Sequence, residues 1–141
     1  MTANRSSHAA TSHAAVVTPA PAGGSARLTN AQRMAAVATL LDPEGTFKPH
    51  PRAAAFLIRR ALEEHLDAYV RRNRPALARC SMGTKTVWLA HHLDSALAGR
   101  LAAVWHSLSC ACHHQQYAMA PTVGEILSWR TEVEHVLAAI G

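Results

Sequence analysis

Hydrophobic side chains recur along this chain at the three- and four-residue spacing of helices that bury one side. Four long segments show this pattern, at about 30–41, 52–72, 95–117 and 123–140, and a shorter one covers about 84–92. The third is the longest, running uninterrupted from Gly99 to Tyr117 after a cap at Asp94 and Ser95. The expected inward positions of the four long segments are Met34, Val37, Leu40 and Leu41; Ala55, Ile58, Leu62, Leu66 and Tyr69; Leu97, Leu101, Val104, Leu108 and Ala111; and Ile126, Trp129, Val133, Val136 and Ile140. The short segment carries Val87, Trp88 and Leu89.

Capping residues in the sequence mark where these helical segments begin. Thr29 or Asn30 can cap the first helix, and Thr122 with Glu125 forms the capping box that precedes the last. The intervening connections are short, which favours antiparallel neighbours. The sequence therefore predicts an all-α fold over residues 29–141: an antiparallel four-helix bundle with a short extra helix.

The chain begins differently. Residues 1–28 are mostly Ala, Ser, Thr, Pro and Gly, with two arginines and no acidic residue. Such a composition cannot bury enough apolar surface to offset the entropy lost on ordering. We therefore expect a disordered tail ahead of the helical domain.

The composition indicates which kinds of partner and which cellular compartment to expect. Lys and Arg together number 14 against 9 Asp and Glu, which gives a formal net charge of +5 and is compatible with an anionic partner. The three cysteines show no paired spacing, so the sequence favours a reducing compartment over a disulfide framework. Neither a secretory signal nor an apolar run long enough to span a membrane is apparent. These features predict a cytoplasmic protein without a membrane segment.

Candidate chemistry gathers on the segment from Gly99 to Tyr117. His106, Cys110 and His113 follow one another at four- and three-residue offsets, on the side opposite the apolar stripe. Three interpretations stay open for this polar face. It is an interface where small and polar residues pack, a zinc site made by one thiolate and two imidazoles, or a phosphate or RNA site. The last would combine Arg100 with His106, His113 or His114.

The zinc interpretation lacks a fourth ligand, because no CxxC or HxxxH pair elsewhere supplies one. The prediction is therefore a site with no bound metal and no cofactor.

The run W-H-S-L-S-x-A-C-H-H-x-x-Y-x-x-x-P-T-x-x-E-I-L-x-W, from Trp105 to Trp129, resembles the C-terminal half of small helical proteins common in actinobacteria. More distantly, residues of about 52–139 resemble the HEPN superfamily. Its members are helical bundles, often dimeric, and many are RNases of toxin–antitoxin and antiphage systems. Those with RNase activity carry Arg, then four to six residues, then His. Arg100 and His106 match that pattern with five intervening residues.

The resemblance implies roles for this pair. Arg100 would stabilise the scissile phosphate, and His106 would act as general acid or base in attack by a ribose 2′-hydroxyl, with no metal. Leu101 departs from the Asn, Asp or His that the RNases favour directly after the arginine. Six helical residues turn by about 240° and rise roughly 9 Å, and Arg100 falls near the apolar stripe. Arg100 and His106 would therefore converge only across a symmetric dimer, or if the helix begins later than Gly99. Cys110, His113 and His114 offer an alternative polar face beside His106.

Two classes of function are therefore expected, and whether the chain is an enzyme is left open. One is a HEPN-like domain of a defence, stress or toxin–antitoxin system, acting on RNA as a homodimeric, metal-independent endoribonuclease. The other is a non-catalytic helical module whose polar face contacts a protein partner. A zinc-stabilised helical domain is a third hypothesis.

Overall fold

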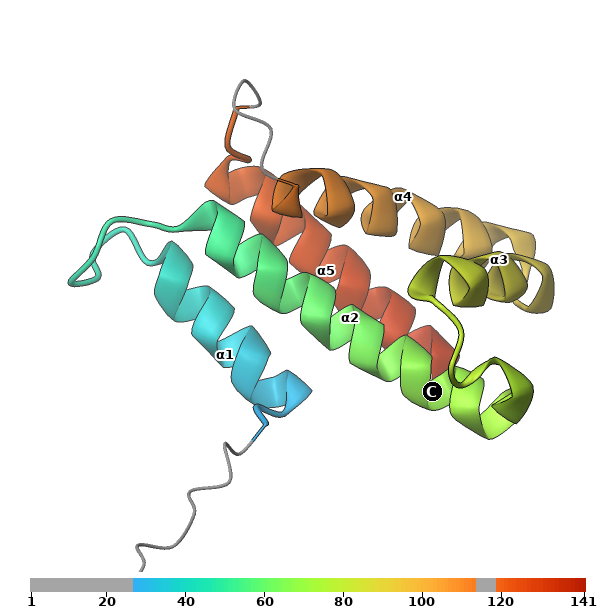
Figure 1. The fold of residues 1–141 in the computed structure, drawn as a ribbon. Helices are drawn as coiled ribbons and strands as arrows, with labels where there is room; N and C mark the ends of the chain where they lie inside the picture. The colour runs from blue at the N-terminus through green and yellow to red at the C-terminus, as the bar shows by residue number, and fades with distance from the viewer. Residues whose placement is uncertain (1–26, 114–118) are drawn as a thin grey trace, which may run out of the picture.

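The fold was obtained as a computed structural model that describes residues 27–113 and 119–141 (Figure 1). In chain order this part contains α1 (Asn30–Leu41), α2 (Pro51–Asn73), the short 3₁₀ turn η1 (Pro75–Leu77), α3 (Met82–His92), α4 (Ser95–Cys112) and α5 (Val123–Ile140), and it contains no strand. The predicted all-α class is confirmed. Of the expected disordered tail, residues 1–26 lie outside the described residues.

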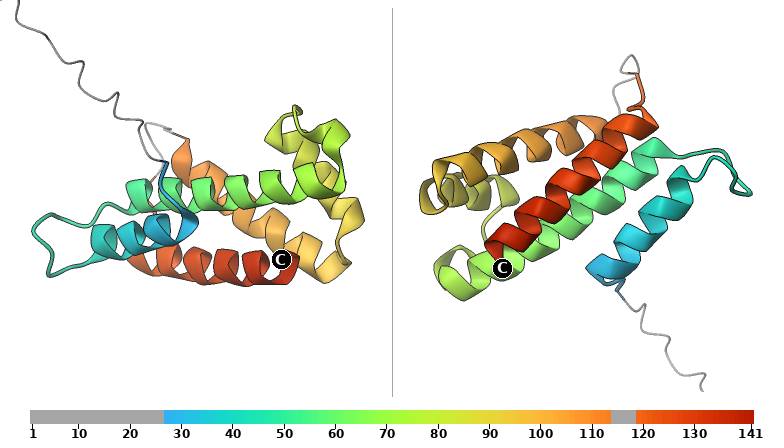
Figure 2. Two further views of the ribbon diagram at one scale, coloured as in Figure 1. Left: turned by 90° about the horizontal axis from the view of Figure 1, so that it is seen from below. Right: turned by 180° about the vertical axis from the view of Figure 1, so that it is seen from behind.

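The bundle is built around α2, which contacts α1, α4 and α5. Figure 1 shows α1 lying along α2, and α3 packed on α4 at the end of the molecule away from α1. Figure 2 shows α2 and α5 running side by side along most of their length. The four long helices with α3 as the short fifth match the predicted bundle.

Local signals explain most helix boundaries. The Thr122 hydroxyl accepts a hydrogen bond from the Glu125 N–H at 3.2 Å, and the Glu125 carboxylate accepts one from the Thr122 N–H at 2.7 Å, which completes the predicted capping box. Asp94 caps α4 by accepting from the first N–H groups of that helix. Two boundaries were predicted wrongly. α3 begins at Met82, because Ser81 caps it, and α4 ends at Cys112 instead of Tyr117, because His113 has extended backbone.

The core follows the predicted stripes. Ala54, Ala55 and Ala61 on α2 are fully buried, and these small side chains let neighbouring helices approach closely. Leu40, Tyr69, Leu97 and Trp129 are only half-buried, so those four inward predictions were too strong. Val87 on the short helix is exposed. The largest fully buried side chains are Val37, Ile58, Leu62, Leu66, Val70, Leu89, Leu108, Ile126, Val133 and Val136.

Among the helices of the described ranges, none combines the length and the apolar character that crossing a bilayer requires.

Candidate functional site

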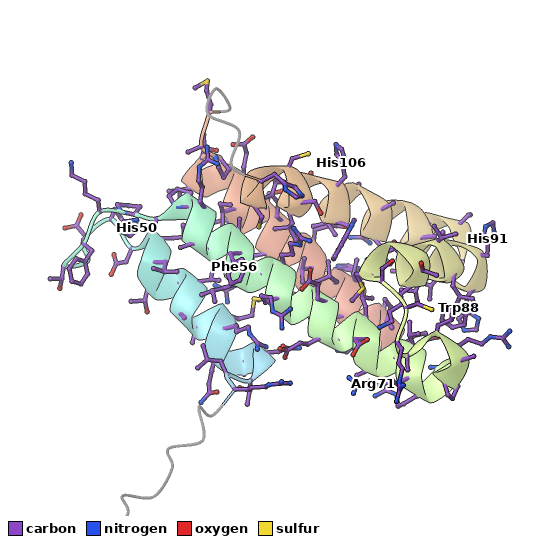
Figure 3. All side chains as sticks on the ribbon, in the orientation of Figure 1. His50, Phe56, Arg71, Trp88, His91 and His106 are labelled. Atoms are coloured by element: carbon purple, nitrogen blue, oxygen red, sulfur yellow. The ribbon has the colours of Figure 1, made fainter. Side chains whose placement is uncertain are left out.

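The predicted site residues lie on α4, and the helix turns them as its sequence pattern requires. Leu101, Val104, Leu108 and Ala111 are buried against the bundle. His106, Cys110 and His113 are exposed. Figure 3 shows His106 on the side of α4 turned away from the other long helices. His114, the remaining candidate, lies outside the described residues.

Arg100 does not turn toward His106. Its guanidinium pairs with the carboxylate of Glu132 on α5 through Nε and Nη2, at 2.5 and 3.0 Å. The hydrogen bonds hold the pKa of Glu132 below its usual value and raise the pKa of Arg100. Helical spacing placed Arg100 near the core stripe, yet its side chain is 42% exposed because it reaches sideways to α5. Within one chain, the predicted catalytic pair is therefore not brought together.

His106 and Cys110 do meet. The His106 Nε2 and Cys110 Sγ atoms are 3.6 Å apart, one helical turn along α4. Both line a surface pocket of ≈ 560 Å³ formed with the start of α5 and the segment before it, including Thr122, Glu125 and Trp129. The Glu125 carboxylate is committed to the cap, where hydrogen bonds from Thr122 lower its pKa. The pocket therefore offers a thiol and an imidazole as its reactive groups.

His113 belongs to a different surface. Together with Cys112 it lines a second pocket of ≈ 370 Å³, against Arg59, Arg60 and Glu63 of α2. Burial raises the pKa of the Cys112 thiol, which disfavours its thiolate. The face that the sequence predicts as one group is thus divided in two, with His106 and Cys110 on the α5 side and His113 on the α2 side.

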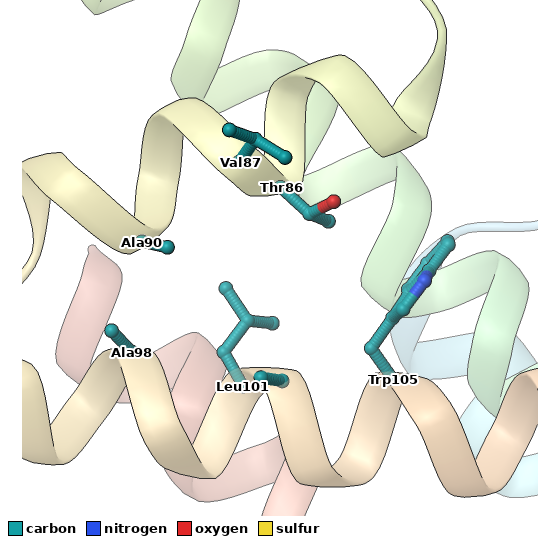
Figure 4. A pocket seen from close by; sticks show the side chains of 7 residues that line it. Thr86, Val87, Ala90, Ala98, Leu101 and Trp105 are labelled. Atoms are coloured by element: carbon teal, nitrogen blue, oxygen red, sulfur yellow. The ribbon is translucent and has the colours of Figure 1, made fainter.

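A groove between α3 and α4 was not predicted. It has a volume of ≈ 250 Å³, and Ala90 and Ala98 lie on its opposite walls with Trp105 at one end (Figure 4). Val87 at its rim is 61% exposed. The only clue in the sequence was the absence of charge at these positions. The groove is lined by Thr86, Val87, Ala90, Ala98, Leu101, Ala102 and Trp105.

The charged residues of α3 and α4 each pair with another helix. Histidines aside, these two fully described helices carry only Lys85 and Arg100 as charged residues. Lys85 is 5% exposed, pairs with Asp67 of α2 and donates to the Ala78 carbonyl at 2.9 Å. Arg100, although 42% exposed, is held by Glu132 of α5, and the remaining exposed surface of both helices carries no Lys, Arg, Asp or Glu side chain.

We refer to this surface as the docking face, and its members come from both helices. They are Val87 and Ala90 of α3 and Ala98, Ala102, Ala103 and His106 of α4.

No group of three or more His, Cys, Asp or Glu side chains within residues 27–113 and 119–141 is arranged to hold a metal ion. Comparisons of the chain with protein-family models, with curated proteins and with solved structures give no match. The resemblance to the HEPN superfamily therefore stays a prediction.

Proposed function

We propose that this chain is a non-catalytic helical interaction module that associates with a second copy of itself through the docking face. The observation that supports the proposal is the pairing of Lys85 with Asp67 and of Arg100 with Glu132, each on another helix. Apart from Arg100, the exposed residues of α3 and α4 include no Lys, Arg, Asp or Glu. Exposed helix faces normally carry charged side chains, so a face without them is typical of a surface that a partner covers.

A second copy suits this face better than a charged partner does. The chain has a formal net charge of +5, so most approaches of two copies bring like charges together. Contact between two docking faces avoids that repulsion, because neither face presents a charged group. The small side chains of Ala98, Ala102 and Ala103 would let the two α4 backbones pack closely. The same patch serves both copies in an isologous dimer, so no second surface is needed.

The direct test is the mass of the full chain in solution by light scattering, compared between two variants. Ala102→Arg places a charge at the centre of the docking face. Ala38→Arg places the same charge on an exposed alanine of α1. Arginine is nearly as good a helix former as alanine, so both variants should keep the helical content of the wild type.

We expect a dimer for the wild type and for Ala38→Arg, and a monomer for Ala102→Arg. A wild-type monomer at every concentration, or a dimer that survives Ala102→Arg, would contradict the proposal.

A second candidate function is metal-independent RNA cleavage in a HEPN-like defence or stress protein. It is favoured by one observation, the exposed His106 imidazole at the edge of a pocket of ≈ 560 Å³. Arg100 would have to leave Glu132 to reach a phosphate near His106. The test is cleavage of RNA by the purified protein in EDTA, with His106→Ala and Arg100→Ala alongside. Cleavage lost in both variants would support this candidate, and equal cleavage by all three proteins would remove it.

A further inference from the structure

The pair formed by His106 and Cys110 has the geometry of half a zinc site. Zinc binds imidazole nitrogen at about 2.0–2.1 Å and thiolate sulfur at about 2.3 Å, which at a tetrahedral angle separates the two ligand atoms by about 3.6 Å. The His106 Nε2 and Cys110 Sγ atoms are 3.6 Å apart. Both side chains are exposed, so an ion could reach them without rearrangement of α4.

Among the described residues that line the pocket of the pair, none is Lys or Arg. The charged group of α4 nearest in sequence, Arg100, is held by Glu132 and so does not compete for the site. Lys85 is buried against Asp67. The neighbouring thiol of Cys112 lies in the other pocket, on the α2 side of the helix.

The pair is incomplete within one chain. A structural zinc site is closed by four protein ligands, and no third His, Cys, Asp or Glu completes a group with these two in the described part of the chain. Glu125 lines the same pocket, but its carboxylate is engaged by Thr122. The missing ligands must come from another molecule.

We propose that one zinc ion joins two copies of this chain, bound by His106 and Cys110 of each. This inference rests on the self-association proposed above, because a two-fold axis beside His106 brings an identical second pair to the ion. The site is then a tetrahedral Cys₂His₂ centre. Two thiols lose their protons to the solvent on binding, so that two thiolates neutralise the ion, and each imidazole binds through Nε2 with its proton on Nδ1.

The experiment uses the full chain, stripped of metal with a chelator and then titrated with zinc chloride. Bound zinc is measured by mass spectrometry and molecular mass by light scattering. His106→Ala and Cys110→Ala remove the ligands, while His135→Ala and Cys80→Ala change a histidine and a cysteine away from the site. Cobalt(II) serves as a spectroscopic probe, since a tetrahedral thiolate site gives intense visible bands and a sulfur-to-metal charge-transfer band.

We expect one zinc ion for every two chains in the wild type and in both control variants. Zinc binding and the cobalt bands should disappear in His106→Ala and in Cys110→Ala, and the chelator should lower the fraction of dimer. A metal-free dimer that binds no zinc and is broken by Ala102→Arg would overturn the zinc site while leaving the proposed function intact. One zinc per chain in a monomer would overturn both the shared site and the proposed self-association. A monomer without zinc would overturn them equally.

Discussion

Charged side chains on α2 and charged side chains on α3 and α4 find their ion-pair partners in different places. On α2, arginines pair with acidic residues of the same helix, as Arg59 does with Glu63 at 3.0 Å and Arg71 with Asp67 at 2.7 Å. On α3 and α4, each charged side chain instead reaches a different helix: Lys85 pairs with Asp67 of α2, and Arg100 with Glu132 of α5. Arg59 and Arg71 therefore pair along one helix, whereas Lys85 and Arg100 each link two helices, Lys85 from a buried position and Arg100 from a position 42% exposed.

Ion pairs within one helix and ion pairs between two helices contribute to the structure in different ways. Pairs along one exposed helix contribute little to stability, because water screens them and ordering both side chains costs entropy. Pairs between helices fix how two elements pack when one partner is buried. In this chain the second kind has a further consequence, because it holds Lys85 and Arg100 away from the docking face. The proposed contact between two copies depends on that consequence.

The largest expected effect on stability comes from removing a partner of Asp67, which pairs with both Lys85 and Arg71. Lys85→Ala removes a cation that is 5% exposed and leaves the Ala78 carbonyl and one carboxylate oxygen without their donor. We expect the free energy of unfolding to fall by about 3 kcal/mol. Arg71→Ala removes the exposed partner of the same carboxylate and should lower it by less than about 1 kcal/mol. Urea unfolding of both variants measures the difference, and equal losses would mean that the comparison fails.

Glu64, three residues before Asp67 on α2, allows the same comparison. Arg33 on α1 holds its carboxylate with two hydrogen bonds of 2.7 Å and is largely buried, while Arg60 on α2 reaches it at 3.3 Å from solvent. We expect Arg33→Ala to lower the free energy of unfolding by about 2 kcal/mol and Arg60→Ala by less than about 1 kcal/mol.

The contribution of the Arg33–Glu64 pair to stability should also depend on pH. The hydrogen bond from Arg33 is the main cause that holds the pKa of Glu64 below its usual value. The Glu64 carboxylate therefore binds a proton less readily in the folded state than in the unfolded state. The contribution is therefore fully present above the ordinary glutamate pKa of about 4.3 and is lost as the pH falls through the lowered value. Arg33→Ala should flatten the decline in stability below that pH. An unchanged slope in acid would show that the pair contributes nothing.

The smallest effect is expected for Arg100→Ala. The Arg100–Glu132 pair is exposed, so its loss should leave the melting temperature close to that of the wild type. It should also leave the dimer intact, because the guanidinium points to α5 and away from the docking face. Glu132→Gln is the matched control, since it removes the charge of the other partner. Dissociation of the dimer in Arg100→Ala, measured by light scattering, would place this arginine in the interface.

Features set within one segment could be predicted from the sequence. The apolar stripe of α4 and the capping box of Thr122 and Glu125 depend on residues three or four positions apart, and both were confirmed. The pairing of Arg100 with Glu132 could not be predicted, because it depends on how α4 and α5 are rotated against each other. The same rotation places His113 against α2 and His106 away from it.

Coverage of the docking face can be measured directly on its alanines. With alanine methyl groups labelled for NMR and a soluble gadolinium chelate added, solvent-exposed methyls broaden more than covered ones. Ala102 and Ala103 are compared with Ala35 and Ala38, which are also exposed in a single chain but lie on α1. We predict that the α4 methyls are shielded as the protein concentration rises, while the α1 methyls stay accessible. Equal broadening of all four methyls at every concentration would contradict self-association through the docking face.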